Sequence, residues 1–397
     1  MKVRFLMLVC LLSCGLLKAQ IIVPMPVQYE FSELGSFVVD DKTVVEISDE
    51  SLVFPAQLFS EKVKEMCGLD LLENNRGRKK VKLKINSYMS HPDSYHISVN
   101  DKAVQITGGS EAGVYYGVLM LIQCMSNEYA SVDREAHTLT FPLILVEDTP
   151  LFTFRALEWE DSYVPTSELK KRIERMSELN LNTYVVPMEY NEMAAYVLSD
   201  KQKWYGLSEY ATDYYVNVVP KVIVSKEMLA FGADSVASIM DRIYDIFPSE
   251  FVQMEFGDLN VDENLWNVID ERAQKRQKTL VPDKTAVGAT MVSVPFGRQS
   301  EVNLNSTIGE IIVIDLTDND GNAEMYNVAP IKRKRVNKTF IPLNGVQFVV
   351  NTADKKDVVI DDLYEFMPFC SEAAWTKSEL KSFDDFGRRK AHLFKEK

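Results

Sequence analysis

Two carboxylates in the middle of the chain, Glu255 and Asp258, are of the residue type that carries out general acid–base chemistry. A carboxylic acid can protonate a leaving oxygen, and a carboxylate can orient or activate a reacting group. Glu255 ends a segment, residues 251–255, that the pattern predicts to be a strand. A separation of three places two strand side chains on opposite faces, so the pair can act together only if a bulge intervenes. Both residues are candidate catalytic residues, and the alternative is that neither has a catalytic role.

A second charged group lies in and after residues 152–157, which the pattern also predicts to be a strand. Arg155 lies inside this apolar segment, where an unpaired buried charge is costly. It is therefore either a ligand in a pocket or half of a structural ion pair with Glu158 or Asp258. Three carboxylates follow it closely and form either a solvated strand end or part of the same site: Glu158, Glu160 and Asp161.

Histidines and cysteines give no sign of a metal centre. The four histidines are scattered, and two of the five cysteines lie in a predicted targeting segment. The other three are widely spaced: Cys67, Cys124 and Cys370. An odd number at wide spacing predicts neither a disulfide framework nor a metal site, and whether two of them pair is left open. We expect no metal and no cofactor.

The chain begins with a segment typical of secretion signals. A short basic start and an apolar run, residues 5–12, precede Ala19, a small residue suited to cleavage. The run is too short to span a membrane, and no later stretch is apolar enough to do so. We expect residues 1–19 to be removed and the protein to be secreted or periplasmic. Retention as a lipoprotein through Cys14 is the alternative.

The composition narrows the class of protein further. A hydrophobic content of 46% supplies real cores and argues against disorder. The length of 397 residues suggests two or three domains of about 150 residues. A formal net charge of −14 disfavours nucleic acids and anionic membranes as partners.

Residues 20–148 alternate predicted strands with two predicted helices. The strands are predicted at 37–39, 43–47, 81–85, 95–99 and 103–107. The helices are predicted at 55–66 and 110–125, and the second is apolar almost all round. A small sheet covered by helices is an α+β arrangement.

Residues 149–397 follow a different pattern, which begins after Asp148-Thr149-Pro150. Strands alternating with helices as far as residue 255 imply a parallel sheet. Between residues 286 and 351 we expect strands at 291–294, 310–316, 338–341 and 346–350, with no helix between them. A complete (β/α)8 barrel needs a helix after each strand. The sequence therefore predicts an α/β TIM-barrel-like domain that is eroded or incomplete.

Several stretches resemble the β-N-acetylhexosaminidases of glycoside hydrolase family 20. Residues 22–26, 91–99 and 109–117 are similar to the accessory domain that precedes the barrel in that family. Gly113 and Gly117 lie four apart on the predicted apolar helix, where small residues allow close packing. Phe154-Arg155-Ala156 is similar to the first barrel strand of the family, and residues 371–388 to its last helical region. The resemblance implies that Arg155 binds the hydroxyls of a terminal sugar.

The catalytic pattern of that family is not retained. In family 20 the N-acetyl oxygen of the substrate is the nucleophile, an aspartate orients the acetamide, and the next residue, a glutamate, protonates the leaving oxygen. At the corresponding place this chain has Gly257-Asp258-Leu259, so the glutamate is absent in either alignment register. Three other family positions differ as well, at residues 186–189, 220–223 and 351–353.

The resemblance and the departures together predict a secreted β-N-acetylhexosaminidase-like protein that is catalytically inactive. Its role would be glycan binding or an accessory function in glycan degradation, with an N-acetylhexosamine-containing glycan as partner. The first alternative is an active β-N-acetylhexosaminidase, or a related glycosidase, that uses a displaced acid such as Asp258. The second is a protein-interaction module.

Overall fold

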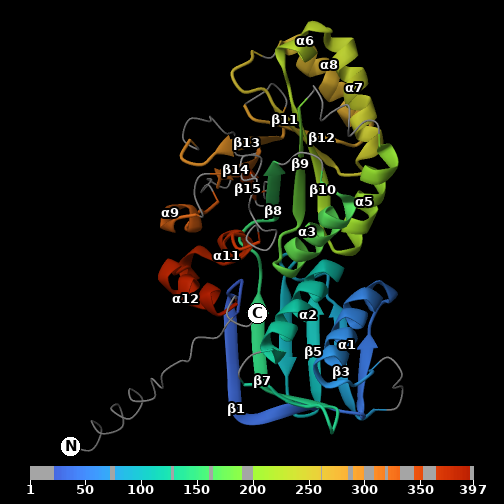
Figure 1. Cartoon of the computed structure of the whole chain (residues 1–397), viewed down its shortest axis with the longest axis vertical. Helices are drawn as coiled ribbons and strands as arrows, with labels where there is room; N and C mark the ends of the chain where they lie inside the picture. The colour runs from blue at the N-terminus through green and yellow to red at the C-terminus, as the bar shows by residue number, and fades with distance from the viewer. Residues whose placement is uncertain are drawn as a thin grey trace, which may run out of the picture.

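The computed structural model describes residues 22–71, 77–126, 129–160, 164–189, 200–260, 262–284, 289–298, 308–317, 321–330, 344–351 and 364–393. The chain has two parts, a smaller N-terminal part and a larger part built on a second sheet (Figure 1). The first sheet ends at Asp148, and the second begins at Phe154.

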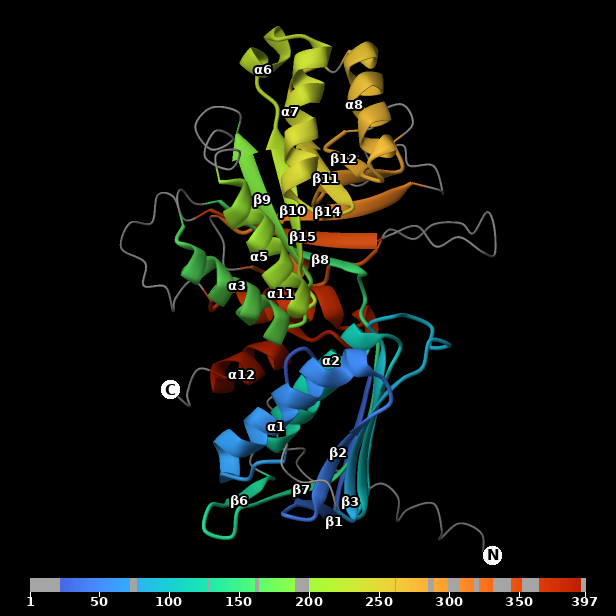
Figure 2. The same cartoon turned by 90° about the vertical axis from the view of Figure 1, so that its right-hand side faces the viewer.

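The N-terminal part is a mixed sheet in the strand order β1-β7-β4-β5-β3-β2, with β6 paired to β7. Its strands are β1 (Gln28–Val39), β2 (Thr43–Ile47), β3 (Lys79–Ile85), β4 (Tyr95–Val99), β5 (Ala103–Gly108), β6 (Ser131–Asp133) and β7 (Thr138–Asp148). Its helices are η1 (Glu50–Leu52), α1 (Val53–Cys67) and α2 (Glu111–Met125). Both long helices lie on one face of the sheet, and the ribbon shows no helix on the other (Figure 2).

Helix α2 packs closely on the sheet because two of its positions carry no side chain. A Cβ added at Gly117 would lie 2.6 Å from Cγ2 of Ile106, and one at Gly113 would lie 2.5 Å from the carbonyl oxygen of Ser94. The hydroxyl of Ser110 caps the helix by accepting from the Gly113 amide at 3.4 Å. The close packing expected from the two glycines is confirmed.

The second part is a sheet of eight parallel strands in the order β12-β11-β10-β9-β8-β15-β14-β13. They are β8 (Phe154–Glu160), β9 (Thr183–Glu189), β10 (Asn217–Ile223), β11 (Phe251–Glu255), β12 (Thr279–Pro282), β13 (Met291–Pro295), β14 (Gly309–Asp315) and β15 (Asn344–Asn351). Adjacent strands form parallel ladders from β12 round to β13. No ladder joins β12 to β13 among the described residues, so the barrel is nearly but not fully closed.

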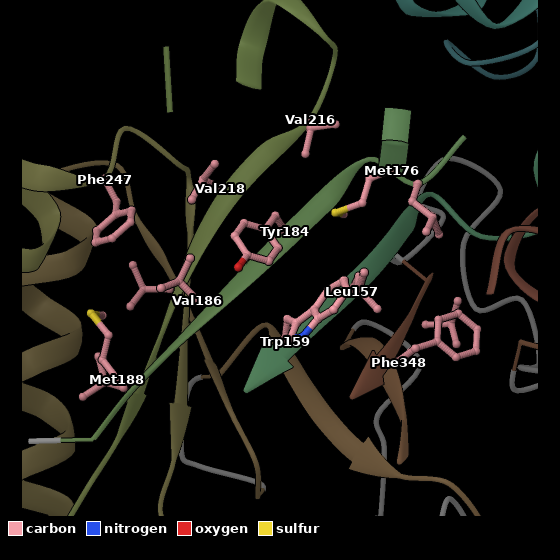
Figure 3. Packing of buried hydrophobic residues seen from close by; sticks show 14 of the residues in the cluster. Leu157, Trp159, Met176, Tyr184, Val186, Met188, Val216, Val218, Phe247 and Phe348 are labelled. Atoms are coloured by element: carbon pink, nitrogen blue, oxygen red, sulfur yellow. The ribbon is translucent and has the colours of Figure 1, made fainter. Parts of the chain in front are cut away.

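Helices cover the outside of this barrel. They are α3 (Thr166–Glu178), α5 (Lys201–Asp213), α6 (Lys226–Ala230), α7 (Ala233–Ile246), α8 (Glu263–Lys275), α9 (Ala323–Tyr326), α11 (Met367–Trp375) and α12 (Phe383–Leu393), with η3 (Ser378–Leu380) between the last two. Side chains from one face of the strands, among them Leu157, Trp159 and Val186, form the core beneath the helices (Figure 3). No helix among the described residues has the length and apolar character needed to cross a membrane.

The predicted fold class is confirmed, an α+β part followed by a TIM-barrel-like part. One detail of the prediction is wrong, because the short helix α9 lies between residues 286 and 351. A single turn is too short to show helical periodicity. It forms here because the side chain of Asn322 accepts from the amides of Glu324 and Met325, both at 3.0 Å. Residues 1–19 and the strand predicted at 338–341 lie outside the described residues.

A buried carboxylate joins the two parts. Asp148, at the end of β7, accepts from the hydroxyl of Tyr95 at 2.7 Å and from the indole N–H of Trp375 on α11 at 2.8 Å. The backbone amides of Val27 and Thr149 donate to its other oxygen. Burial raises the pKa of Asp148 to about 6, although these four hydrogen bonds lower it. Trp375 is itself part of the N-terminal hydrophobic core, so the two parts share buried side chains.

The three cysteines left open by the sequence do not pair. Cys67, Cys124 and Cys370 are each buried and free. Burial raises the pKa of the Cys124 thiol to about 12, which makes this side chain an inert part of the core.

Candidate functional site

The lower half of the barrel interior is apolar. Strand side chains alternate between the helix-covered face and the barrel interior. The interior set forms its own small cluster: Phe154, Ala156, Val185, Val219, Val281, Met291 and Ile311. This layer closes the barrel below the carboxyl ends of its strands, the end at which TIM-barrel enzymes place their sites.

Above this layer lies a network of charged and amide side chains, which we call the barrel network: Glu158, Lys221, Gln253, Glu255 and Gln347. The Lys221 ammonium lies 2.7 Å from Oε1 of Glu158 and 2.6 Å from Oε2 of Glu255. The amide of Gln347 donates to the other oxygen of Glu158. The amide of Gln253 donates to Oε1 of Gln347 at 2.5 Å. Four strands thus contribute to one connected set of buried polar contacts.

The positions of these residues follow from strand alternation. Glu158 is two residues after Ala156 on β8, and Lys221 is two residues after Val219 on β10, so each shares the inward face of an apolar neighbour. Glu255 and Gln253 follow Phe251 on β11 in the same way. Isolated polar residues in otherwise apolar strands are the sequence signal for such a network. The Val-Val-Pro-Lys-Val-Ile run around Lys221 carries that signal, although Lys221 is not among the site residues predicted from the sequence.

Within the barrel network, Glu158, Lys221 and Glu255 form a salt-bridge triad with one exposed end. Glu158 is fully buried, and Lys221 is 9% exposed. The Glu255 side chain is 40% exposed, so it lies at the open end. Burial lowers the pKa of Lys221, but the two carboxylates raise it by more, and the net pKa lies above its usual value. Lys221 is therefore a permanent cation between two carboxylates at neutral pH.

The candidate catalytic residue Asp258 lies apart from this triad. It follows the end of β11 on a turn whose Gly257 has φ of +53°, and its side chain is exposed. No hydrogen bond or ion pair joins Asp258 to another residue that the structure describes. The strand ends at Glu255, which is paired with Lys221, so the structure does not bring the two candidate carboxylates into contact.

The turn that carries Asp258 is held from the end of β12. The Gly257 amide donates to Oδ2 of Asp283 at 2.8 Å. The ammonium of Lys284 donates to the carbonyl oxygens of Gly257 and Leu259, both at 2.7 Å. The Leu259 side chain is partly buried against the core beneath the barrel helices. The residue that follows Asp258 is thus an apolar anchor of the turn.

Arg155 lies at the start of β8, beside the junction with the N-terminal part. Its Nη1 forms an ion pair with Oδ2 of Asp93 at 2.9 Å, and its Nη2 donates to the hydroxyl of Tyr116 at 3.1 Å. Its Nε donates to the carbonyl oxygen of Asn180 at 2.7 Å, and Nη1 also donates to the carbonyl oxygens of Phe152 and Thr153. The guanidinium stacks over the ring of Trp375, 4.8 Å from its centroid, and the side chain is fully buried.

The predicted ion-pair partners of Arg155 are wrong. Glu158 is three residues further along β8, so its side chain points into the barrel, on the opposite face from Arg155. The observed partner Asp93 comes from the N-terminal part, which the sequence did not indicate. These contacts make Arg155 a joint between the two parts, and its binding of sugar stays a prediction that rests on the resemblance alone.

Several other predicted site positions lie outside the residues that the structure describes. The Glu160 side chain and Asp161 lie outside the described residues, as do the Asn351 side chain and residues 352–353. Among the side chains that the structure describes, no group of three His, Cys, Asp or Glu residues is arranged to hold a metal ion.

Comparison with known sequences places a family domain in the first part. Residues 19–149 match the domain described as Glycosyl hydrolase family 20, domain 2. Over 169 residues the chain is 26% identical to a beta-hexosaminidase from Porphyromonas gingivalis strain ATCC BAA-308 / W83. That alignment covers 41% of this chain and 22% of the relative, so it spans about a fifth of the relative's length.

Solved structures share the whole fold. A GH20 exo beta-N-acetylglucosaminidase from Vibrio harveyi superimposes with a TM-score of 0.75 at 13% identity, over 94% of this chain and 76% of its own. The beta-N-acetylhexosaminidase from Bacteroides fragilis NCTC 9343 does so with a TM-score of 0.72 at 14% identity, over 95% and 96%. At such identities the likeness is one of fold. The chain therefore combines a segment that matches domain 2 of glycosyl hydrolase family 20 with a barrel that shares the fold of these structures.

Proposed function

We propose that the protein is a β-hexosaminidase-like member of the family 20 lineage that recognises an N-acetylhexosamine-containing glycan and does not hydrolyse it. One observation carries this proposal, the turn after β11. Where the family has an aspartate followed by a glutamate, this chain has Asp258 followed by Leu259, whose side chain packs on the core. Leucine has no proton to donate, and general acid catalysis is commonly worth about 10²–10⁴-fold in rate.

The nearby carboxylates are poor substitutes for the missing acid. Glycosidase acids are kept protonated by an apolar pocket or by a neighbouring carboxylate. Asp258 is exposed on its turn and has neither environment among the described residues. Glu255 and Glu158 are both engaged in ion pairs with the Lys221 ammonium. A general acid must instead carry a proton that it can give to the leaving oxygen.

The role that remains is recognition. The fold shared with a family 20 structure covers 94% of this chain, and residues 19–149 match domain 2 of that family. We propose that the chain is secreted after loss of residues 1–19 and acts beside glycan-degrading enzymes, as the predicted signal segment suggests.

Incubation with a tetrasaccharide of β-linked N-acetylglucosamine tests this proposal. Calorimetric titration should show a dissociation constant in the millimolar range. A site that has lost several of the family's sugar-binding residues offers few charge-assisted hydrogen bonds, and each of them contributes only about 1.5–3 kcal/mol. Mass spectrometry of the recovered sugar should show an unchanged chain length. Shortening of the chain that is abolished by Asp258→Ala would instead favour an active glycosidase with a displaced acid. Intact sugar with no detectable heat would favour the protein-interaction module.

A further inference from the structure

The face of the N-terminal sheet opposite α1 and α2 carries a row of lysines. Val81 and Leu83 of β3 are fully buried under the helices. The alternate residues Lys80, Lys82 and Lys84 therefore project from the other face, which the ribbon shows without a covering helix (Figure 2). The row stands out in a chain whose formal net charge is −14.

The neighbouring strands add hydrogen-bonding side chains to this face. In the ladder register, Lys82 lies opposite Gln105 of β5, and Gln105 lies opposite Ser98 of β4. Lys84 lies opposite Thr107. We call this surface the lysine face, and it comprises Lys80, Lys82, Lys84, Ser98, Gln105 and Thr107. It is a flat platform of ammonium, amide and hydroxyl groups.

Part of the positive charge on this face has no acidic partner. Lys80 pairs with Glu46 of β2 at 2.7 Å, and both side chains are more than two-fifths exposed. The Lys84 ammonium contacts the Gln105 side-chain oxygen at 3.3 Å, which is a neutral partner. Lys82 lies opposite Glu46 in the β2–β3 ladder, but no ion pair joins Lys82 to another described residue. The acidic side chains further across the same face, Glu147 and Glu30, belong to β7 and β1. The β3 side of the face is therefore cationic.

A highly exposed tyrosine, Tyr88, follows the row four residues after Lys84 in sequence. Tyr88 follows β3 on a turn in which the Asn86 side chain accepts from the Tyr88 amide at 3.2 Å. The Tyr88 side chain is 95% exposed, more than any other large aromatic among the exposed hydrophobic residues described. Tyrosine combines an apolar ring with a polar hydroxyl, a combination suited to partners that are apolar on one side and hydrated on the other.

The row also points toward the barrel. The segment after β3 contacts the first barrel residues, where Nε2 of His91 lies 3.2 Å from the Thr153 hydroxyl and Asp93 pairs with Arg155. A linear chain laid along Lys80, Lys82 and Lys84 would be led past Tyr88 to the junction of the two parts.

We propose that the lysine face and Tyr88 form a docking surface for an acidic polysaccharide, one that carries carboxylate or sulfate groups. The charge complementarity is local, because the Debye length is about 8 Å at physiological ionic strength and the distant negative charges are screened. Hydroxyls of the glycan pair with the amide and hydroxyl groups of the platform, and a sugar ring stacks on Tyr88. The proposal rests on the glycan-recognising role proposed above and names a second, charged class of ligand for it.

Affinity electrophoresis of the full chain in gels that contain heparin, polygalacturonate or neutral dextran tests this surface. Heparin and polygalacturonate separate sulfate from carboxylate recognition, and dextran is the uncharged control. We expect retention by at least one acidic polysaccharide and none by dextran. The combined change Lys80→Gln, Lys82→Gln and Lys84→Gln should weaken the affinity about twentyfold, the middle of the range for three exposed ion pairs. It should also flatten the dependence of log affinity on log salt by about one for each lysine.

A matched variant removes three exposed lysines elsewhere, Lys201→Gln, Lys226→Gln and Lys275→Gln. It changes the net charge equally, and its affinity should stay within about twofold of the wild type, since surface changes away from a site are close to neutral. Tyr88→Ala should weaken binding about threefold or more and leave the salt dependence unchanged. Circular dichroism melting confirms that each variant is folded.

Three results would overturn the proposal. The first is that neither acidic polysaccharide retains the protein. The second is that the two triple variants weaken the affinity equally. The third is that the protein binds anionic phospholipid vesicles more tightly than either polysaccharide. None of them depends on whether the barrel hydrolyses or binds N-acetylglucosamine, so this surface can fail while the proposed function stands.

Discussion

Replacing Lys221 by methionine removes the cation of the barrel network while keeping the length of the side chain. Glu158 is fully buried and would lose the ion pair with Lys221 while keeping the amide hydrogen bond from Gln347. Breaking a buried ion pair by removing one partner typically costs about 3–5 kcal/mol, because the other charge is left uncompensated. We expect Lys221→Met to lower the free energy of unfolding by that amount.

Two further variants separate the charge from the packing. The double change Lys221→Met and Glu158→Gln should recover most of the loss, since replacing both members of a buried pair is often close to neutral. Lys62→Met removes an exposed ion pair with Glu65 and should leave the unfolding midpoint unchanged. Calorimetric and denaturant unfolding measure all three variants.

The loss in Lys221→Met should depend on pH in a definite direction. A buried carboxylate without its cation takes up a proton more readily, so its pKa in the folded variant rises above the unfolded value. The variant then binds more protons folded than unfolded, and its stability increases as the pH falls from 8 to about 5. A loss below about 1 kcal/mol, or a loss that is the same at both pH values, would refute the buried triad.

Other expectations follow from the junction and the helix packing. Burial raises the pKa of Asp148 from its usual 3.8 to about 6, so the folded state binds the proton more tightly than the unfolded state. The free energy of unfolding should therefore fall by about 2 kcal/mol as the pH rises from 4 to 6. Titration of the unfolding midpoint should lose that slope in Asp148→Asn. Gly117→Ala should cost about 1–3 kcal/mol by denaturant unfolding, because the new methyl overlaps Ile106, and an unchanged midpoint would contradict the close packing of α2. Arg155→Ala should lower the free energy of unfolding by about 3–5 kcal/mol, because it leaves Asp93 unpaired at the junction. A variant that is as stable as the wild type but no longer binds sugar would instead support the sugar-binding role that the family resemblance implies for Arg155.

The fold could be predicted where local pattern and tertiary packing agree. The strand predicted at 95–99 coincides with β4, whose residues alternate between buried and partly buried positions. The strand predicted at 43–47 coincides with β2, a run rich in β-branched residues. Strand β7 was not predicted, although it is central to the first sheet. Its residues 138–141 alternate polar and apolar side chains, but Pro142 and the continuous apolar residues 143–146 interrupt that alternation. Its partners on β1 and β4 are distant in sequence.

The candidate site was predictable only in part, for the same reason. The end of β11 was found because a strand followed by Gly257 and Asp258 is a local pattern. Lys221 and Glu158 are 63 residues apart, and their pairing exists only once β8 and β10 lie in one barrel. Asp93 reaches Arg155 from a different sheet. Such partners are set by topology, which the residue pattern around each position does not contain.

The central claim, that the turn after β11 lacks the acid of a working hexosaminidase, is tested most directly by the rate of hydrolysis of an aryl N-acetyl-β-glucosaminide. The purified mature protein should be measured beside an active family 20 enzyme at equal concentration. We expect no turnover above the blank, consistent with a loss of at least about 10²–10⁴-fold from the missing general acid alone. Two results together would contradict the claim. The first is turnover within about tenfold of the active enzyme, a difference of only about 1.4 kcal/mol in the activation barrier. The second is the loss of that turnover in Asp258→Ala or Glu255→Gln.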